Sequence, residues 1–196
     1  LKNHFYDVYD LQHLSEIETV FKNDGLVGLN VTIPFKEKVV PYLDELSDEA
    51  EKTGAVNCIL IKDQVKKGYN TDVFGFEKTL LLHRKDFHDS ALVLGNGGAA
   101  KAVKYVLEQH QIPYQTVSRN ADLNFGNLTA ETIRKNRLII QCTPVGTFPN
   151  VDACLDFPFD GITGQHLVVD LIYNPDYTTF IKKSSEKGAK TVNGFY

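Results

Sequence analysis

The chain has 196 residues, enough for one large domain or two small ones with buried apolar cores. Its formal net charge of −4 comes from mixed charges and argues against a nucleic-acid-binding face. No apolar run approaches the length of a membrane span and no signal peptide opens the sequence, so we expect a cytoplasmic protein that binds neither nucleic acid nor a membrane.

The cysteines and histidines give no sign of a metal site. Cys58, Cys142 and Cys154 are odd in number and lack CxxC spacing, so we predict small reduced thiols of a reducing compartment. The six histidines show no metal-ligand spacing such as HExxH, and no metal ligands are predicted.

The first part of the chain mixes short strands with helices and turns. Apolar alternation, helical spacing, a turn at Gly25 and a C-cap at Gly54 define these elements. In chain order they are a strand over 5–9, a helix over 15–23, a strand over 28–32, a helical segment over 37–46 broken at Pro41, a helix over 48–54, and paired strands over 55–62 and 64–69.

A longer helix and a polar linker come next. Helical spacing predicts a helix over 73–83, and Asp72 immediately before it is a natural N-cap. Residues 84–90 are polar and charged and form the best candidate boundary. We therefore predict a first domain over 1–84 and a second domain over 85–196.

The second domain alternates strands and helices. The predicted strands are 91–94, 114–117, 138–141, 167–172 and 189–192, and the predicted helices are 99–110, 130–136 and 177–187. Strands without internal alternation, linked by helices, imply a parallel sheet covered on both faces.

The turn after the strand over 91–94 has the form G-x-G-x-x-G/A and opens the next helix. In that design the first Gly permits the tight turn, the second lets the backbone approach a pyrophosphate, and the third small residue packs helix on strand. The helix N-terminus supplies N–H donors for the phosphates. The predicted cofactor-binding residues of this turn are Gly95, Asn96, Gly97, Gly98 and Ala99, with Ala100 in the third small position.

Two further loops bear on the cofactor. After the strand over 114–117, an NAD site usually has an acid, whereas Ser118 and Arg119 stand here and can bind a 2′-phosphate. This favours NADP, and a surface Arg in a turn is the alternative. The loop with Thr143 and Pro144 either holds the nicotinamide ribose or is a rigid turn, and the spacing does not decide.

The segment Asn30-Val31-Thr32-Ile33-Pro34-Phe35-Lys36 sets three polar groups among apolar residues. Pro34 fits the first turn of a helix, which places Lys36 in that turn, at the positive end of the helix dipole. A cation is mildly disfavoured there, so Lys36 gains from an anionic or hydroxyl partner. A solvated Lys on an exposed helix is the alternative, and the segment alone favours it.

Asp72 is the candidate partner of Lys36, across a cleft between the two domains. Capping alone would explain Asp72, but a Lys beside a carboxylate can deliver or remove the proton that carbonyl reduction by hydride transfer requires. The neutral side chains of Asn30, Thr32 and Asn57 would suit a polyhydroxylated small substrate, and each also has a structural explanation.

Together these segments resemble the shikimate dehydrogenase family. The matching segments are Asn30–Lys36, Gly54–Asn57, Asn70–Asp72, Gly95–Ala100, Cys142–Gly146 and Asp170–Pro175, in family order from about residue 25 to the end. The first, with its Lys, is highly specific, whereas many folds share the Gly-rich turn.

The resemblance implies an α/β fold with an N-terminal α/β substrate-binding domain, a Rossmann-like NADP-binding domain with a parallel sheet, and a cleft between them. It implies reversible NADPH-dependent reduction of 3-dehydroshikimate to shikimate in aromatic amino-acid biosynthesis. Lys36 and Asp72 fall on the family's catalytic pair, and Thr32, Asn57 and Tyr173 fall on shikimate contacts. Among cofactor positions, Arg119 falls on the 2′-phosphate-binding Arg and Leu171 on the nicotinamide pocket.

The sequence also departs from the family pattern. Asn120 replaces a Thr after Arg119, Leu123 stands where a second basic residue is frequent, and Thr147 replaces a frequent Met. The family's first strand, its Ser-x-Ser clamp and its C-terminal helix are missing, and the sequence contains no Met. We therefore expect an interval of a longer protein.

The leading interpretation is an NADP-dependent oxidoreductase that acts on a small molecule, as a monomer or homodimer. A quinate/shikimate dehydrogenase that prefers NAD is a close alternative. A non-catalytic nucleotide-binding module is a different one, and the presence of both Lys36 and Asp72 disfavours it.

Overall fold

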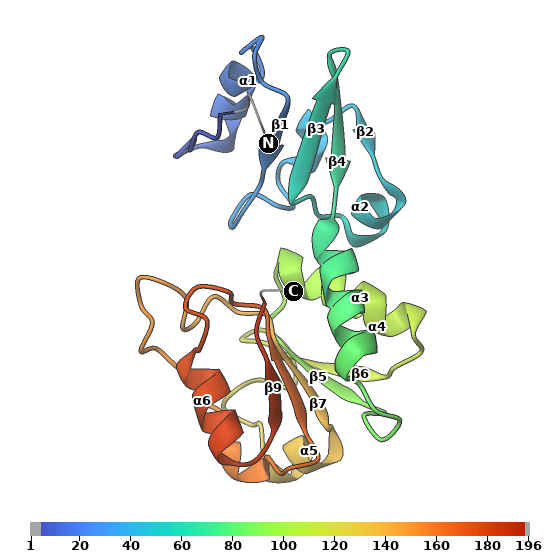
Figure 1. Ribbon diagram of the computed structural model, residues 1–196, viewed down its shortest axis with the longest axis vertical. Helices are drawn as coiled ribbons and strands as arrows, with labels where there is room; N and C mark the ends of the chain where they lie inside the picture. Colours follow the sequence, from blue (N-terminus) through green and yellow to red (C-terminus); the bar gives the residue numbers. More distant parts are fainter. Residues whose placement is uncertain (1–4, 195–196) are drawn as a thin grey trace.

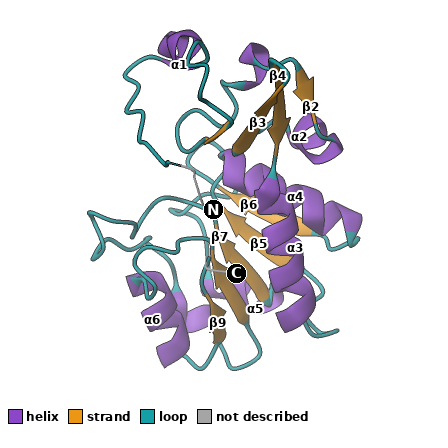
Figure 2. Ribbon diagram, turned by 45° about the horizontal axis from the view of Figure 1, so that its top comes forward, coloured by secondary structure: helices purple, strands orange, loops and turns teal. Residues whose placement is uncertain are grey.

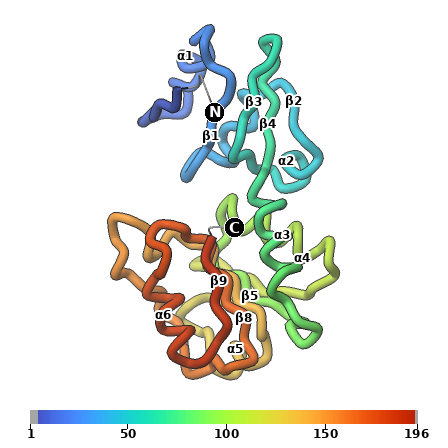
Figure 3. The backbone as a smooth tube through the Cα atoms, viewed as in Figure 1, coloured from blue at the N-terminus to red at the C-terminus, as the bar shows by residue number. Residues whose placement is uncertain are grey.

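A computed structural model of the chain describes residues 5–194 and contains two sheets. The first region, residues 5–70, contains the first sheet and forms one end of the molecule (Figure 1). The second region, residues 71–194, contains the second sheet and forms the other end. The chain passes from the first to the second between β4 (Val65–Tyr69) and α3 (Thr71–His83) (Figure 3). The predicted α/β fold with a parallel sheet is therefore confirmed.

The first sheet has the strand order β1-β3-β4-β2. β1 pairs with β3 and β3 with β4 in antiparallel fashion, whereas β2 runs parallel to β4. Its strands are β1 (Gly28–Asn30), β2 (Glu45–Leu46), β3 (Cys58–Lys62) and β4 (Val65–Tyr69). The helices of this region are η1 (Leu14–Glu16), α1 (Ile17–Val20), η2 (Val40–Tyr42) and α2 (Asp48–Thr53). As predicted, α2 ends at Gly54, which has a left-handed φ of 59°.

The second sheet has the order β6-β5-β7-β8-β9, with every pairing parallel. Its strands are β5 (Ala91–Leu94), β6 (Tyr114–Val117), β7 (Leu138–Gln141), β8 (Leu167–Asp170) and β9 (Lys190–Val192). The helices of this region are α3 (Thr71–His83), α4 (Gly98–Gln109), α5 (Ala130–Lys135), η3 (Phe159–Gly161) and α6 (Thr179–Glu186). In such an order, ligands bind at the carboxyl ends of the strands where the direction of winding reverses, here beside β5 and β7.

Helices cover both faces of this parallel sheet (Figure 2). Alternate residues of β5 face opposite cores: Val93 packs with α3 and α4, and Leu92 packs with α5 and α6. Because both faces are buried, β5, β7 and β8 consist entirely of buried residues. This explains the unbroken apolar runs in the sequence.

Helix α3 packs with the second region. Val73, Phe76 and Leu80 belong to the same buried cluster as β5 and α4. The boundary between residues 84 and 85 stays a prediction, since α3 lies before it in sequence and yet shares its core with the residues after it.

Three predictions for the first region are wrong. Residues 5–9 form no strand: Phe5 and Val8 are 97% and 86% exposed, and no strand among the described residues pairs with this segment. The helix over 15–23 is reduced to η1 and α1. The helical segment expected to begin at Pro34 consists of turns followed by η2, so Lys36 does not lie in the first turn of a helix.

Candidate active site

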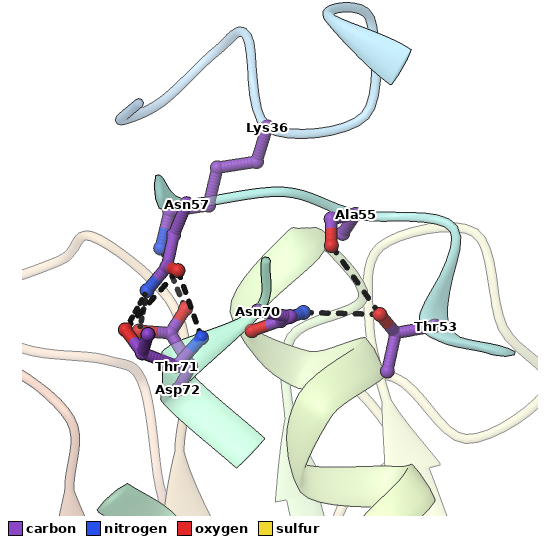
Figure 4. Close-up of polar contacts among 7 residues, drawn as sticks. All are labelled: Lys36, Thr53, Ala55, Asn57, Asn70, Thr71 and Asp72. Carbon is purple, nitrogen blue, oxygen red and sulfur yellow. Dashed lines mark hydrogen bonds and ion pairs between the residues drawn. The ribbon is translucent and has the colours of Figure 1, made fainter. Parts of the chain in front are cut away.

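Lys36 and Asp72 form an ion pair, as predicted. Lys36 Nζ lies 2.7 Å from Asp72 Oδ2, and the two side chains are 17% and 30% exposed. The Lys36 carbonyl accepts a hydrogen bond from the Val56 N–H at 2.7 Å, which ties the turn containing Lys36 to the segment before β3. The pair thus joins a turn of the first region to the start of α3 (Figure 4).

Asp72 is not the N-cap of its helix. The N-cap of α3 is Asn70, and Asp72 lies in the first turn after it. A carboxylate in this turn is stabilised by the positive end of the helix dipole. From this position Asp72 accepts hydrogen bonds from two side chains of the first region, Lys36 at Oδ2 and Asn57 at Oδ1.

Asn57 links this pair to the backbone. Its Nδ2 donates to Asp72 Oδ1 at 2.7 Å and to Thr71 Oγ1 at 3.0 Å, and its Oδ1 accepts from the Thr71 N–H at 2.9 Å (Figure 4). Asn57 therefore supplies the cap that Asn70 does not make, and it also orients Asp72. The role of Thr71 was missed in the sequence, because it depends on a partner 14 residues away.

The Asn70 side chain points away from Asp72 and toward Thr53 of α2 (Figure 4). It is buried, and its Nδ2 donates to Thr53 Oγ1 at 3.0 Å (Figure 4). The Thr53 hydroxyl in turn donates to the Glu49 carbonyl at 2.6 Å. Asn70 consequently holds α2 beside the start of α3.

The other predicted substrate-binding side chains are more open to solvent. Asn30 is exposed and donates to Tyr6 Oη at 3.1 Å, and Thr32, two residues later, is exposed as well. Tyr173 lies in the loop after β8 and is 65% exposed. Their roles toward a substrate stay predictions.

The Gly-rich turn follows β5 as predicted. Gly95 has φ 113°, and a Cβ there would lie 3.1 Å from Thr143 Cγ2 and 3.3 Å from the Cys142 carbonyl carbon. Glycine is required by both the backbone angle and the close approach of the loop after β7. A Cβ on Gly97 would have nothing within 4 Å, so the turn faces open space at this point.

The loops after β6 and β7 lie at the same end of the sheet as this turn, because all these strands are parallel. Arg119 is exposed and Ser118 is half-buried after β6. After β7, the Gln141 side chain accepts from the Thr143 N–H and donates to the Val145 carbonyl, which fixes the conformation of the loop around the exposed Pro144. This supporting role of Gln141 was missed, since a Gln within a strand gives no signal of it.

The loop after β8 is held by a buried acid. Asp170 accepts hydrogen bonds from Thr178 Oγ1 at 2.6 Å and from the Ile172 N–H at 3.0 Å. Burial raises the pKa of Asp170 to about 6, against the effect of these two hydrogen bonds. Leu171 lies between Asp170 and Ile172 in the chain. Its N–H donates to the Gln141 carbonyl at 3.0 Å, which places Leu171 beside the loop after β7.

Lys104 is a further cation near the Gly-rich turn. Its Nζ donates to the Asn96 Oδ1 at 2.5 Å, and burial lowers the pKa of this amine. Its position on α4, behind the turn, could have been inferred from helical spacing, but it was not singled out in the sequence. Asn96 is exposed, so this contact stabilises the rim of the turn.

Within residues 5–194, no group of His, Cys, Asp and Glu side chains is arranged to hold a metal ion. No helix in the same range has the length and apolar character needed to cross a membrane. The three cysteines are free thiols.

Sequence comparisons find relatives of this chain. Residues 2–59 match the substrate binding domain of shikimate dehydrogenase. A shikimate dehydrogenase (NADP(+)) of Desulforamulus reducens is 36% identical, with 87% of this chain and 66% of that protein covered. One of Methanosphaera stadtmanae, with the same description, is 34% identical over 94% of this chain and 72% of that protein. The chain therefore spans about two thirds to three quarters of the length of these relatives.

The fold is similar to that of solved structures. Shikimate 5-dehydrogenase from Thermus thermophilus, solved in complex with NADP(H) and shikimate, is 30% identical with a TM-score of 0.76. The similarity covers 92% of this chain and 70% of that one.

Proposed function

The chain belongs to the shikimate dehydrogenase family, and we propose that it carries the site for reversible, NADPH-dependent reduction of 3-dehydroshikimate to shikimate. The observation that supports this most directly is the Lys36–Asp72 ion pair of 2.7 Å, close to the start of α4 and therefore to the Gly-rich turn. A nicotinamide cofactor supplies the hydride when it is bound.

In this proposal Lys36 is the acid–base group. Reduction turns a carbonyl into an alcohol, and the Lys36 ammonium donates the proton that the alcohol oxygen gains. In the reverse direction the neutral amine accepts that proton. Asp72 holds the Nζ atom in place, while Asn57 fixes the orientation of the carboxylate.

The cofactor site that we propose lies at the carboxyl ends of β5, β6, β7 and β8. The residues that would hold the cofactor are Gly95, Asn96, Gly97, Gly98, Ala99, Ser118, Arg119, Thr143, Pro144 and Leu171. Two features of the structure fit this group: the open space at Gly97 and the exposed Arg119 at the end of β6. Backbone N–H groups at the start of α4 suit phosphates, and the Arg119 guanidinium suits a 2′-phosphate.

One observation keeps NAD as a second candidate cofactor. Leu123 occupies the position where a second basic residue would reinforce Arg119, so a single cation would have to distinguish NADP from NAD. Comparing turnover with each cofactor, and with shikimate and quinate as substrates, separates an NADP-dependent shikimate dehydrogenase from an NAD-dependent quinate/shikimate dehydrogenase.

For the substrate we propose the side chains of Asn30, Thr32, Asn57 and Tyr173, all neutral hydrogen-bonding groups suited to a polyhydroxylated ring. The cleft between residues 1–84 and 85–196 is part of the same proposal. We also propose a cytoplasmic location, in agreement with three free thiols, and a monomer or homodimer.

The test is an absorbance assay of NADP reduction with shikimate, performed on the full-length natural protein. We expect Lys36→Ala to lower kcat by about 10²- to 10⁴-fold, the usual range for loss of a general acid–base group. NADPH binding, followed by its fluorescence, should persist. Lys38→Ala is the matched control, because Lys38 is an exposed lysine two residues away. Retained turnover in Lys36→Ala would remove Lys36 from the mechanism.

A further inference from the structure

Gly98 is the residue of the Gly-rich turn that the dinucleotide fingerprint leaves unexplained. The fingerprint assigns its small positions to Gly95, Gly97 and Ala100, whereas Gly98 is already the first residue of α4. Its φ is not in the left-handed region. Since Ala is a better helix former than Gly, the helix itself gives no reason for a glycine at this position.

A contact with Lys36 gives that reason. A Cβ on Gly98 would lie 3.2 Å from Lys36 Cβ, 3.5 Å from Lys36 Cδ and 3.8 Å from Ala55 Cβ. The shortest of these is below the usual carbon–carbon contact of about 3.5–4.0 Å. The aliphatic part of Lys36 therefore lies directly on the first turn of α4, in space that a side chain at position 98 would occupy.

Lys36 has little freedom to move away from this contact. Its carbonyl is held by the Val56 N–H at 2.7 Å, and its Nζ is held by Asp72 at 2.7 Å. The side chain is thus fixed at its base and at its tip. Displacement of the middle of the chain would move the Nζ atom relative to the Asp72 carboxylate.

Helix α4 is also held against the first region. Lys101 Nζ lies 2.6 Å from Glu37 Oε2, one turn after Gly98. Lys52 Nζ of α2 lies 5.8 Å from the centre of the Tyr105 ring of α4. Because these contacts oppose a withdrawal of α4, a methyl group added at Gly98 would act mainly on Lys36.

We propose that Gly98 is a positioning residue, whose missing side chain sets the place of Lys36 relative to the turn that would bind the cofactor. This rests on the function proposed above for Lys36. The neighbouring glycine provides a contrast, because a Cβ on Gly97 meets nothing within 4 Å and faces open space, where the proposed function would place the cofactor. The missing side chains of the two glycines therefore serve different neighbours: the cofactor at Gly97 and Lys36 at Gly98. Gly98→Ala keeps the backbone N–H through which residue 98 would hold the cofactor.

The test compares Gly98→Ala with Gly97→Ala in the full-length natural protein. We expect Gly98→Ala to lower kcat by about ten-fold or more while KM for NADP changes by less than about three-fold, because a small misplacement of a reacting group affects turnover before binding. Gly97→Ala should do the reverse, raising KM for NADP more than it lowers kcat. NADPH fluorescence measures binding directly.

A rescue variant distinguishes positioning from a general loss of stability. In the Gly98→Ala background, Ala55→Gly opens the neighbouring side of the contact and should restore part of kcat. If Gly98→Ala merely weakened the fold, a second glycine would lower activity further. Should Gly98→Ala fail to fold, the double variant decides: recovery of folded, active protein supports the contact, and failure to recover overturns it.

The outcomes also separate this inference from the proposed function. Wild-type kcat in Gly98→Ala, or the same change in KM for NADP as in Gly97→Ala, would overturn the role of Gly98 alone. A wild-type protein that does not reduce NADP with shikimate would instead contradict the proposed function and the inference that rests on it.

Discussion

The two regions of this protein differ in how completely their strands are buried. In the parallel sheet, every residue of β5, β7 and β8 is buried between helices on both faces. In the first sheet, β3 has one buried residue and β1 has none. The first region instead leaves polar side chains on its turns and strand ends accessible, including Asn30 and Thr32.

This difference matters for the candidate site. Lys36 comes from a turn of the first region, whereas Asp72 comes from α3, which shares its core with the parallel sheet. The ion pair therefore lies where the region with the more exposed strands meets the region with three fully buried strands. A relative movement of the two regions would act directly on the distance between these two side chains, and the contact at Gly98 lies beside it.

The strongest test of this difference in burial is to make the same substitution in the core of each region. Ile140 of β7 and Ile59 of β3 are 0% and 1% exposed. Ile→Ala in a core costs about 2–5 kcal/mol of the free energy of unfolding, and more where the surroundings cannot collapse into the cavity. We expect Ile140→Ala to fall in the upper part of this range and Ile59→Ala in the lower part, as measured by urea unfolding. An equal or larger cost for Ile59→Ala would contradict the comparison.

The buried acid of the second region predicts a dependence of stability on pH. The pKa of Asp170 in the folded state, about 6, exceeds the ordinary value of 3.8, so the folded state binds its proton more tightly than the unfolded state. The resulting stabilisation is complete below the ordinary value and is lost as the pH rises through about 6. Relative to Asp170→Asn, we expect the wild type to lose up to about 3 kcal/mol between pH 4 and pH 7.

Asp160→Asn serves as the control for this experiment. A hydrogen bond from Lys187 lowers the pKa of Asp160, so its contribution is already present above its ordinary value and stays constant as the pH rises to 7. If the wild type and Asp170→Asn show parallel pH profiles, the carboxylate of Asp170 is not the source of the dependence.

A smaller effect is expected at the carboxyl end of β6. We expect Arg119→Gln to raise KM for NADP by about ten-fold or more, because a hydrogen bond to a charged group contributes about 1.5–3 kcal/mol. KM for NAD, which has no 2′-phosphate, should stay within about two-fold, since Arg119 then loses no charged partner. Equal changes in KM for NADP and for NAD in steady-state assays would mean that Arg119 does not bind the 2′-phosphate.

Sequence patterns were most informative in the parallel sheet. The strands over 91–94 and 138–141, which are completely buried, were predicted with the bounds that the structure has, and so was the partly exposed strand over 114–117. A strand buried on both faces has an uninterrupted apolar run, which turn residues delimit at each end. The strand predicted over 5–9 from its apolar alternation is wrong, because alternation alone does not provide a neighbouring strand to pair with. The apolar residues of this segment stay exposed.

The residues around Lys36 show the opposite case. Pro34 suggested a helix N-terminus, but the segment forms turns that are tied by hydrogen bonds to the chain before β3. Such contacts link residues about twenty positions apart and have no local signature. The sequence could therefore suggest Lys36 as a candidate catalytic residue, but it could not predict the backbone conformation around Lys36.

The sequence by itself determined the parallel sheet, the turn at Gly95 and the family, and it was sufficient to propose that Lys36 pairs with Asp72. These follow from local rules: apolar runs, residues that tolerate particular backbone angles, and short motifs. Only the tertiary structure decided that Asn57 both caps α3 and orients Asp72, and that Gly98 lies against Lys36. Contacts of this kind depend on how separate segments pack, because a distance between side chains on different elements is fixed by the whole core and not by the sequence around either residue.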